Sequence, residues 1–157
     1  MPLLEGVTDT TYLPRLACST DHEVIEALAR ALGDRVKPSL AAAAIAREKR
    51  SPTGLPFPDV AVAIPHAEPE HVATPALVVA SLATPVKFRQ MGSPRTTLAV
   101  RLVVMPALTA KEQAGAALAA LIQSMQNASV RAVLVAAATE AEMRAAVHGG
   151  QAEEGTR

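Results

Sequence analysis

One histidine stands where a side chain can do chemistry, directly after a short apolar run. Val60 to Ile64 has the composition of a buried strand, Pro65 ends it, and His66 follows. Proline lacks an amide hydrogen and fixes φ, so the imidazole should emerge at a sheet edge that solvent reaches. Histidine titrates near neutral pH and carries a nucleophilic ring nitrogen. His66 is therefore predicted to serve acid–base chemistry, metal binding or covalent carriage of a group.

The other histidines and the single cysteine are weaker candidates. His71 lies in the same loop as His66, but no third ligand of suitable spacing accompanies them, so no metal site is predicted. Cys18, beside apolar neighbours, is interpreted as a small packed hydrophobic residue. His22 and His148 are interpreted as surface residues. From residue types alone, a structural role and a chemical role for His66 both stay open.

Composition narrows the class of protein. The 157 residues suit one domain, and because 50% are apolar but only 2% aromatic, aliphatic side chains must fill its core. The 15 basic residues balance the 15 acidic ones, which argues against a nucleic-acid partner. No apolar run approaches the roughly 20 residues that span a bilayer, and the first residues lack a signal-peptide pattern. We expect a cytoplasmic protein without membrane insertion.

Helical spacing and capping residues predict helices on both sides of a block of strands. Thr20 and Glu23 are a candidate capping box for a first helix that ends at Gly33. A second helix is predicted from Ser39 to about Arg50. The last third of the chain is predicted to hold a long helix after the Thr109/Glu112 pair and two shorter ones over 129–137 and 139–147.

The strand candidates are apolar runs between turn residues. They cover residues 60–64, 76–82 and 98–105, with a small edge element at 86–88. Helices precede, interleave with and follow these strands, so the sequence predicts a single α/β layered domain. Residues 149–157 lack an apolar face and are predicted to be a disordered tail.

Several short motifs in fixed order surround His66. They are Arg47-Glu48-Lys49, Pro52-Thr53-Gly54, Val62-Ala63-Ile64-Pro65-His66-Ala67 and, further along, Ala83-Thr84-Pro85-Val86-Lys87-Phe88. This ordered set resembles the enzyme IIA domain of the fructose–mannitol class (type 2) in the sugar phosphotransferase system, with the domain expected over residues 1–148. Segments 57–66 and 88–92 are most similar to the galactitol-type branch. The resemblance implies a mixed β-sheet flanked by helices.

The resemblance also implies a function, that of a phosphoryl carrier. Nε2 of His66 would accept a phosphoryl group from phosphorylated HPr and pass it to a cysteine of an enzyme IIB component. Enzyme IIC would be reached only indirectly, and neither a cofactor nor a metal is implied. The group that accepts a hydrogen bond from Nδ1 of His66 is not identified by the sequence.

Three residues of the motifs that precede His66, namely Arg47, Glu48 and Thr53, have expected roles in or near such a site. Arg47 matches the family's active-site arginine and would pair with phosphoryl oxygens, the alternative being a solvated charge at a helix end. Glu48 is expected to orient Arg47 or to face solvent. Thr53 is expected to form the turn beside Gly54 rather than to donate to the phosphoryl group.

One position departs from the family pattern. Mannitol- and nitrogen-type members carry a second histidine at the start of the helix after the last strand, where this chain aligns Gln113. A glutamine can hydrogen-bond to a phosphoryl oxygen but carries no charge, so Gln113 is predicted to support that group, with a surface position as the alternative. The glutamine favours sugar uptake. The alternative function is a regulatory enzyme IIA of the nitrogen-related type, which acts by phosphorylation-dependent protein binding.

Overall fold

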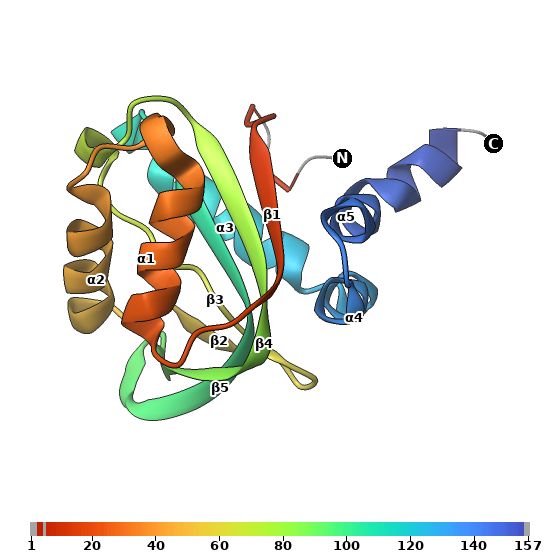
Figure 1. Cartoon of the computed structure of the whole chain (residues 1–157), viewed down its shortest axis with the longest axis horizontal. Coiled ribbons are helices and arrows are strands. Elements are labelled where there is room, and N and C mark those ends of the chain that lie inside the picture. The colour runs from red at the N-terminus through yellow and green to blue at the C-terminus, as the bar shows by residue number, and fades with distance from the viewer. Residues whose placement is uncertain (1–2, 5, 156–157) are drawn as a thin grey trace.

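The computed structural model describes residues 3–4 and 6–155, which form three layers (Figure 1). A twisted β-sheet lies in the middle, with helices α1 (Asp21–Leu32) and α2 (Leu40–Arg50) on one face. Helices α3 (Ala114–Met125), α4 (Ala128–Ala136) and α5 (Glu140–Gly155) cover the other face. The predicted α/β layered architecture is therefore confirmed.

The sheet joins parallel and antiparallel neighbours. Its strands are β1 (Thr10–Leu16), β2 (Gly54–Pro56), β3 (Ala61–Ala63), β4 (Ala76–Gln90) and β5 (Ser93–Ala107). Their order is β1-β4-β2-β3-β5, with an additional β4–β5 pairing. β4 runs parallel to β1 and antiparallel to β5, while β3 runs parallel to β5 and antiparallel to β2. The sheet is thus mixed, and β3, which leads to His66, is held between β2 and β5.

The β4–β5 hairpin is longer than the sequence predicts. Each strand has 15 residues, so residues 86–88 continue β4 and the prediction of a separate edge element there was wrong. Pro85 does not end the strand because it lies in an irregularity of the ladder between Ser81 and Val86, where a missing amide hydrogen breaks no rung. Gly92 closes the hairpin with a φ of 75°, which glycine adopts without strain.

Each face of the sheet carries its own apolar core. Successive residues of a strand point to opposite faces, so Val78 packs beneath α1 and α2 whereas Val79 packs beneath the other helices. Large side chains complete the two cores, Ile25, Leu28, Leu32, Leu40 and Phe88 on the first face and Leu77, Leu121, Met125 and Met143 on the second. Burial on both faces explains the continuous apolar runs of β4 and β5.

The first two helices follow their capping signals only in part. Thr20 caps α1 by accepting the N–H of Glu23 at 3.2 Å, and Gly33, with a φ of 59°, ends it, both as predicted. Ser39 precedes α2 but makes no capping bond, because its hydroxyl bonds to Nδ1 of His71 at 2.8 Å.

The later helices begin and end differently from the predictions. A 3₁₀ turn (Lys111–Gln113) precedes α3, where the sequence predicts a capping box. Asn127, rather than Ser129, caps α4 by accepting two backbone N–H bonds. α5 is assigned from Glu140 to Gly155 and so enters the region 149–157, for which the sequence predicts a disordered tail. Among the described residues, no helix has the length and hydropathy to span a bilayer.

Candidate active site

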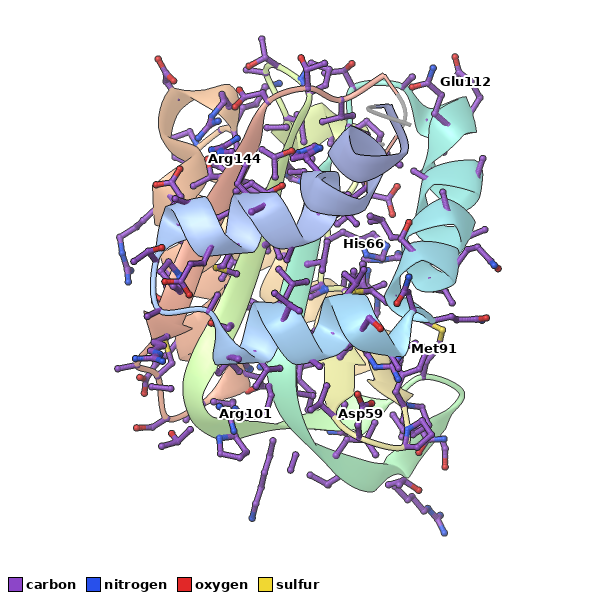
Figure 2. All side chains as sticks on the ribbon, turned by 90° about the vertical axis from the view of Figure 1, so that its right-hand side faces the viewer. Asp59, His66, Met91, Arg101, Glu112 and Arg144 are labelled. Atoms are coloured by element: carbon purple, nitrogen blue, oxygen red, sulfur yellow. The ribbon has the colours of Figure 1, made fainter. Side chains whose placement is uncertain are left out.

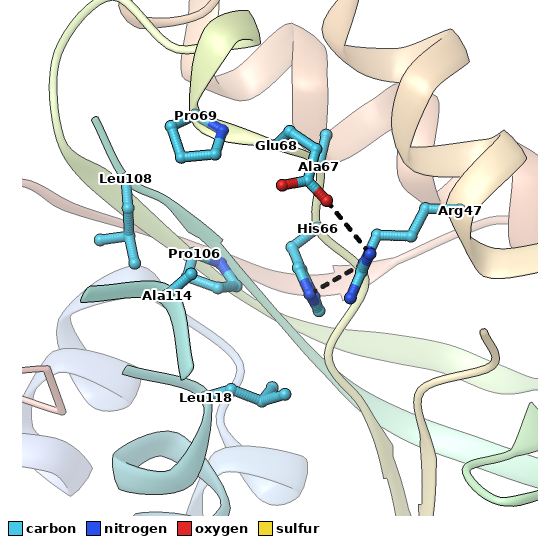
Figure 3. A pocket seen from close by; sticks show the side chains of 9 residues that line it. All are labelled: Arg47, His66, Ala67, Glu68, Pro69, Pro106, Leu108, Ala114 and Leu118. Atoms are coloured by element: carbon cyan, nitrogen blue, oxygen red, sulfur yellow. Dashed lines mark hydrogen bonds and ion pairs between the residues drawn. The ribbon is translucent and has the colours of Figure 1, made fainter. Parts of the chain in front are cut away.

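The end of α2 and the end of β3 bring two predicted site residues together. Arg47 lies in the last turn of α2, and His66 follows β3 after Pro65. Nε of Arg47 donates a hydrogen bond to Nε2 of His66 at 3.0 Å, and Figure 3 shows the two side chains facing each other. The structure therefore gives Arg47 a partner in the site, whereas a solvated charge at the helix end was the alternative.

A backbone carbonyl fixes the tautomer of His66. Nδ1 lies 2.8 Å from the carbonyl oxygen of Ile64, which can only accept, so Nδ1 carries the proton. Nε2 is then the unprotonated nitrogen, consistent with the hydrogen bond that it accepts from Arg47. The sequence could not identify this acceptor because a backbone carbonyl leaves no residue-type signature. The ring presents its lone pair on the side of Arg47.

Glu68 completes the polar side of the site. Nη1 of Arg47 lies 3.2 Å from a carboxylate oxygen of Glu68, which is half exposed. Glu68 lies in the loop after His66, and the path of this loop brings its carboxylate to Arg47. Arg47 thus bridges an imidazole nitrogen and a carboxylate through different nitrogens of one guanidinium.

The surroundings of His66 favour its neutral form. Burial lowers the pKa of His66 below its usual 6.5, and the nearby Arg47 cation lowers it further. The hydrogen bond to Ile64 and the charge of Glu68 act in the opposite direction but do not reverse the shift. At neutral pH the ring is consequently uncharged, which a nitrogen nucleophile requires.

The opposite side of the same cleft is apolar. Its lining residues there are Pro69, Pro106, Leu108, Ala114 and Leu118, the last two from α3. Figure 3 shows this wall across from the Arg47–His66 pair, and Figure 2 shows His66 beside α3. A group bound at Nε2 would thus meet one cation on one side and hydrocarbon on the other.

Gln113 is not brought to this cleft. It is exposed in the turn before α3 and lines a separate groove with Thr109 and Glu112, while Ala114 takes the place beside His66. Helical residues point in directions that differ by about 100° per position, so a shift of one residue decides which side chain enters the cleft. The geometry gives Gln113 the surface position that was its alternative.

Glu48 and Thr53 have contacts that neither expectation described. Glu48 neither orients Arg47 by a hydrogen bond nor faces solvent, because it is buried and accepts bonds from Thr53. Thr53 points its hydroxyl inward to Glu48, away from the position of a donor to the phosphoryl group. Both residues therefore lie behind the site rather than in it.

His71 does not line the cleft of His66, and its Nδ1 lies 2.8 Å from the hydroxyl oxygen of Ser39. Within the described ranges 3–4 and 6–155, no three His, Cys, Asp or Glu side chains gather closely enough to hold a metal ion. The residues that the structure brings together at the cleft are thus His66, Arg47 and Glu68, with Ile64 behind the ring.

Known proteins of similar fold carry the same architecture. The enzyme IIA of the Escherichia coli mannitol system, solved in complex with its phosphorylated enzyme IIB, has a TM-score of 0.72 and 22% identity, over 88% of this chain and 94% of that one. The mannitol-specific cryptic enzyme IIA CmtB from Escherichia coli has a TM-score of 0.70 and 16% identity, over 94% and 98% of the two chains. The nitrogen regulatory protein IIA-Ntr from Neisseria meningitidis has a TM-score of 0.66 and 21% identity, over 93% and 94%.

Sequence comparison identifies the family. No curated protein sequence matches this chain. A family model described as "Phosphoenolpyruvate-dependent sugar phosphotransferase system, EIIA 2" matches residues 8–148, which is nearly the whole described fold and includes every residue of the cleft. The chain therefore belongs to the type-2 enzyme IIA family of the phosphoenolpyruvate-dependent sugar phosphotransferase system.

Proposed function

We propose that His66 is a phosphoryl carrier, which takes the group from phosphorylated HPr and passes it to an enzyme IIB component. The observation that carries the proposal is the pair of hydrogen bonds on the ring, from Arg47 to Nε2 and from Nδ1 to Ile64. They set a neutral nitrogen nucleophile beside a cation that can bind phosphoryl oxygens. Membership of the enzyme IIA family supports this role.

The first transfer moves one phosphorus atom onto the ring. The lone pair of Nε2 forms an N–P bond while the bond from phosphorus to the donor breaks, and the electron pair of that bond returns to the donor. Positive charge develops on the imidazole, which the Ile64 carbonyl stabilises through Nδ1–H. Arg47 releases Nε2 at the same time and turns a donor to the phosphoryl oxygens, since a guanidinium offers five N–H groups.

The second transfer reverses these movements. A cysteine thiolate of enzyme IIB attacks the phosphorus, the N–P bond breaks, and its electron pair returns to Nε2. Arg47 can then donate to Nε2 again, as in the structure described. The apolar wall of Leu108, Ala114 and Leu118 offers a surface that excludes water from the line of attack.

We assign the carrier to sugar uptake, with a substrate of the galactitol type. The support is the similarity of segments 57–66 and 88–92 to that branch, together with the alanine at the wall of the cleft. Among the described residues, no second histidine lines this cleft, unlike the arrangement of mannitol- and nitrogen-type members. The sugar itself would pass through enzyme IIC, which this chain reaches only by way of enzyme IIB.

The decisive experiment is phosphorylation in a purified system. The chain is incubated with labelled phosphoenolpyruvate, enzyme I and HPr, and the acid-labile phosphohistidine is mapped by mass spectrometry. We expect label on His66 in the wild type, none in His66→Ala, and undiminished label in the matched variant His71→Ala from the same loop. Absence of label on the wild type would reject the carrier, and label that survives His66→Ala would reject the site.

A second assay separates uptake from regulation. The phosphorylated chain is mixed with enzyme IIB components of the galactitol, mannitol and fructose systems. Transfer to the galactitol component supports the assignment, and transfer to another identifies a different sugar. Phosphorylation on His66 without transfer to any of them would instead favour the regulatory type.

A further inference from the structure

Glu48 is buried at the C-terminal end of a helix, a position that disfavours an ionised carboxylate. It is 5% exposed, in the last turn of α2, where the negative end of the helix dipole disfavours a carboxylate. Burial raises its pKa, the mark of a desolvation that opposes ionisation. Among the buried residues that the structure describes, Glu48 is the only acid, and it does not line the cleft of His66. Its position therefore calls for an explanation other than contact with the phosphoryl group.

The carboxylate begins a buried chain of hydrogen bonds. One oxygen accepts the backbone N–H of Thr53 at 2.9 Å and the other accepts its hydroxyl at 2.8 Å. The same hydroxyl oxygen accepts the N–H of Ile64 at 3.1 Å. Thr53 donates to Glu48 and accepts from Ile64, so the direction of its O–H is fixed by the two partners.

This chain of bonds ends on the residue that orients His66. The last backbone pairing between β2 and β3 joins Gly54 to Ala63, so Thr53 extends that ladder by one rung through its side chain. Pro65 lacks an N–H and cannot help to hold the segment. With its N–H bound to Thr53, Ile64 directs its carbonyl oxygen at Nδ1 of His66, 2.8 Å away.

Glu48 also adjoins Arg47 in the sequence of α2. Two donors from Thr53 hold the Glu48 side chain, and Glu48 in turn anchors the last turn of the helix that carries Arg47. A single hydrogen-bond network therefore connects the last turn of α2, which carries Arg47, with the backbone just before His66. The cation and the nucleophile are fixed to each other from behind the site.

We propose that Glu48 and Thr53 are positioning residues, which hold Ile64 so that its carbonyl keeps the proton of His66 on Nδ1 and leaves Nε2 free to take a phosphoryl group. The proposal rests on the proposed function of His66 for its consequence in transfer. Its structural part, control of the tautomer, does not depend on any partner protein.

The test compares Thr53→Val with Thr53→Ser. Valine has the shape of threonine without the hydroxyl, so it removes both side-chain bonds, whereas serine keeps them. Nitrogen-15 NMR of the His66 ring reports which nitrogen carries the proton. We expect a shift of the tautomer population toward Nε2–H in Thr53→Val, together with a 10- to 100-fold slower transfer of phosphoryl to His66. Thr53→Ser should restore both quantities.

Ser81→Ala is the matched control for loss of a buried hydroxyl. Ser81 is 1% exposed and accepts the N–H of Arg15 at 2.8 Å, and neither residue lines the cleft. This variant should lower the melting temperature, as Thr53→Val should, but it should leave the His66 tautomer unchanged. An unchanged tautomer and transfer rate in Thr53→Val, with only the melting temperature lowered, would overturn the proposal.

Glu48→Gln provides a second test of the network, one that leaves the Thr53 hydroxyl in place. An amide can accept only one of the two Thr53 donors, so a smaller tautomer shift in the same direction is expected. If Thr53→Val does not fold, an unshifted tautomer in folded Glu48→Gln overturns the proposal by itself. A wild-type chain that accepts no phosphoryl group would reject the proposed function, yet the tautomer comparison would still decide the role of Glu48 and Thr53.

Discussion

The guanidinium of Arg47 donates to Nε2 of His66, 3.0 Å away, and so occupies the lone pair that a nucleophilic attack would use. In this resting arrangement, the Arg47 cation blocks the nucleophilic nitrogen Nε2 of His66. An incoming phosphoryl group offers the same cation stronger, charged acceptors. Exchange of an imidazole nitrogen for phosphoryl oxygens would therefore expose Nε2 only when the donor has arrived.

Replacement of Arg47 by glutamine should slow the acceptance of phosphoryl by His66 about 100-fold, because one preorganised donor to the developing charge is lost. The pKa of His66 should rise, since the Arg47 cation lowers it. Arg47→Lys should show a smaller loss of rate, because the charge remains but the planar fork does not. Rates of label transfer from phosphorylated HPr, and NMR titration of the ring, measure the two effects.

Arg50→Gln is the control for this series, because Arg50 is an exposed arginine at the end of the same helix. It changes the net charge equally but should leave the rate and the pKa of His66 close to wild type. Equal rates in Arg47→Gln and Arg50→Gln would show that the contact with Nε2 has no part in transfer.

The pH dependence of phosphoryl acceptance should follow the lowered pKa of His66. Because burial and the Arg47 cation disfavour the charged ring, more than half of the His66 rings should be neutral at pH 6.5, where an ordinary histidine is half protonated. The rate should accordingly begin to fall at a lower pH than it would for a histidine with an ordinary pKa of 6.5. Single-turnover rates between pH 5 and 8, corrected for the donor's own titration with a second acceptor, measure this profile.

The lowered pKa of His66 also makes the folding stability depend on pH in a predictable direction. A histidine whose folded pKa lies below 6.5 stabilises the fold fully above pH 6.5, and this contribution is lost as the pH falls through the folded pKa. Urea unfolding of wild type and His66→Gln should therefore show a difference in free energy that changes across that window. A difference independent of pH between 5 and 7 would contradict the assigned shift.

How much of the site the sequence predicts depends on the kind of residue involved. His66 could be predicted because Pro65 places it at a strand end, and Arg47 because the family motif includes it. Ile64 could not, since it acts through a carbonyl that every residue has. Gln113 was placed by alignment along the chain, but the 3₁₀ turn before α3 decides which side chain faces the cleft, and that turn has no clear sequence signal.

The fold shows a similar division. The long apolar strands and the helix between Thr20 and Gly33 carry strong local signals and were predicted. The strand β1 was not predicted, because Pro14 lies inside it and its partner β4 lies far away in sequence. The strand β2 was not predicted either, because its three residues Gly54–Pro56 are too few for a periodic signal and include glycine and proline. The sequence predicted the strand to end at residue 82, ahead of Pro85, although an irregularity in the ladder accommodates this proline within β4.

Glu68→Gln should favour phosphorylation of His66. The half-exposed carboxylate competes with the phosphoryl group for Arg47 and repels it, so its neutralisation should raise the phosphorylated fraction at equilibrium about two- to fivefold, the range of an exposed ion pair. The pKa of His66 should fall, because Glu68 raises it. Glu70→Gln, an exposed acid on the same loop, is the control and should change neither quantity. A lower phosphorylated fraction in Glu68→Gln would instead assign Glu68 a supporting role.

Aspartate at two adjacent positions should distinguish the wall of the cleft from the surface beside it. Ala114→Asp places a negative charge against the cleft, so repulsion of the phosphoryl group should slow transfer to His66 at least about tenfold. Gln113→Asp adds the same charge one residue earlier, exposed in the separate groove, and should have little effect on the rate. Both positions lie at the start of α3, where an acid suits the helix dipole, so neither variant should lower the melting temperature much. Transfer rates from phosphorylated HPr compare the two variants, and a larger loss in Gln113→Asp than in Ala114→Asp would return Gln113 to the site.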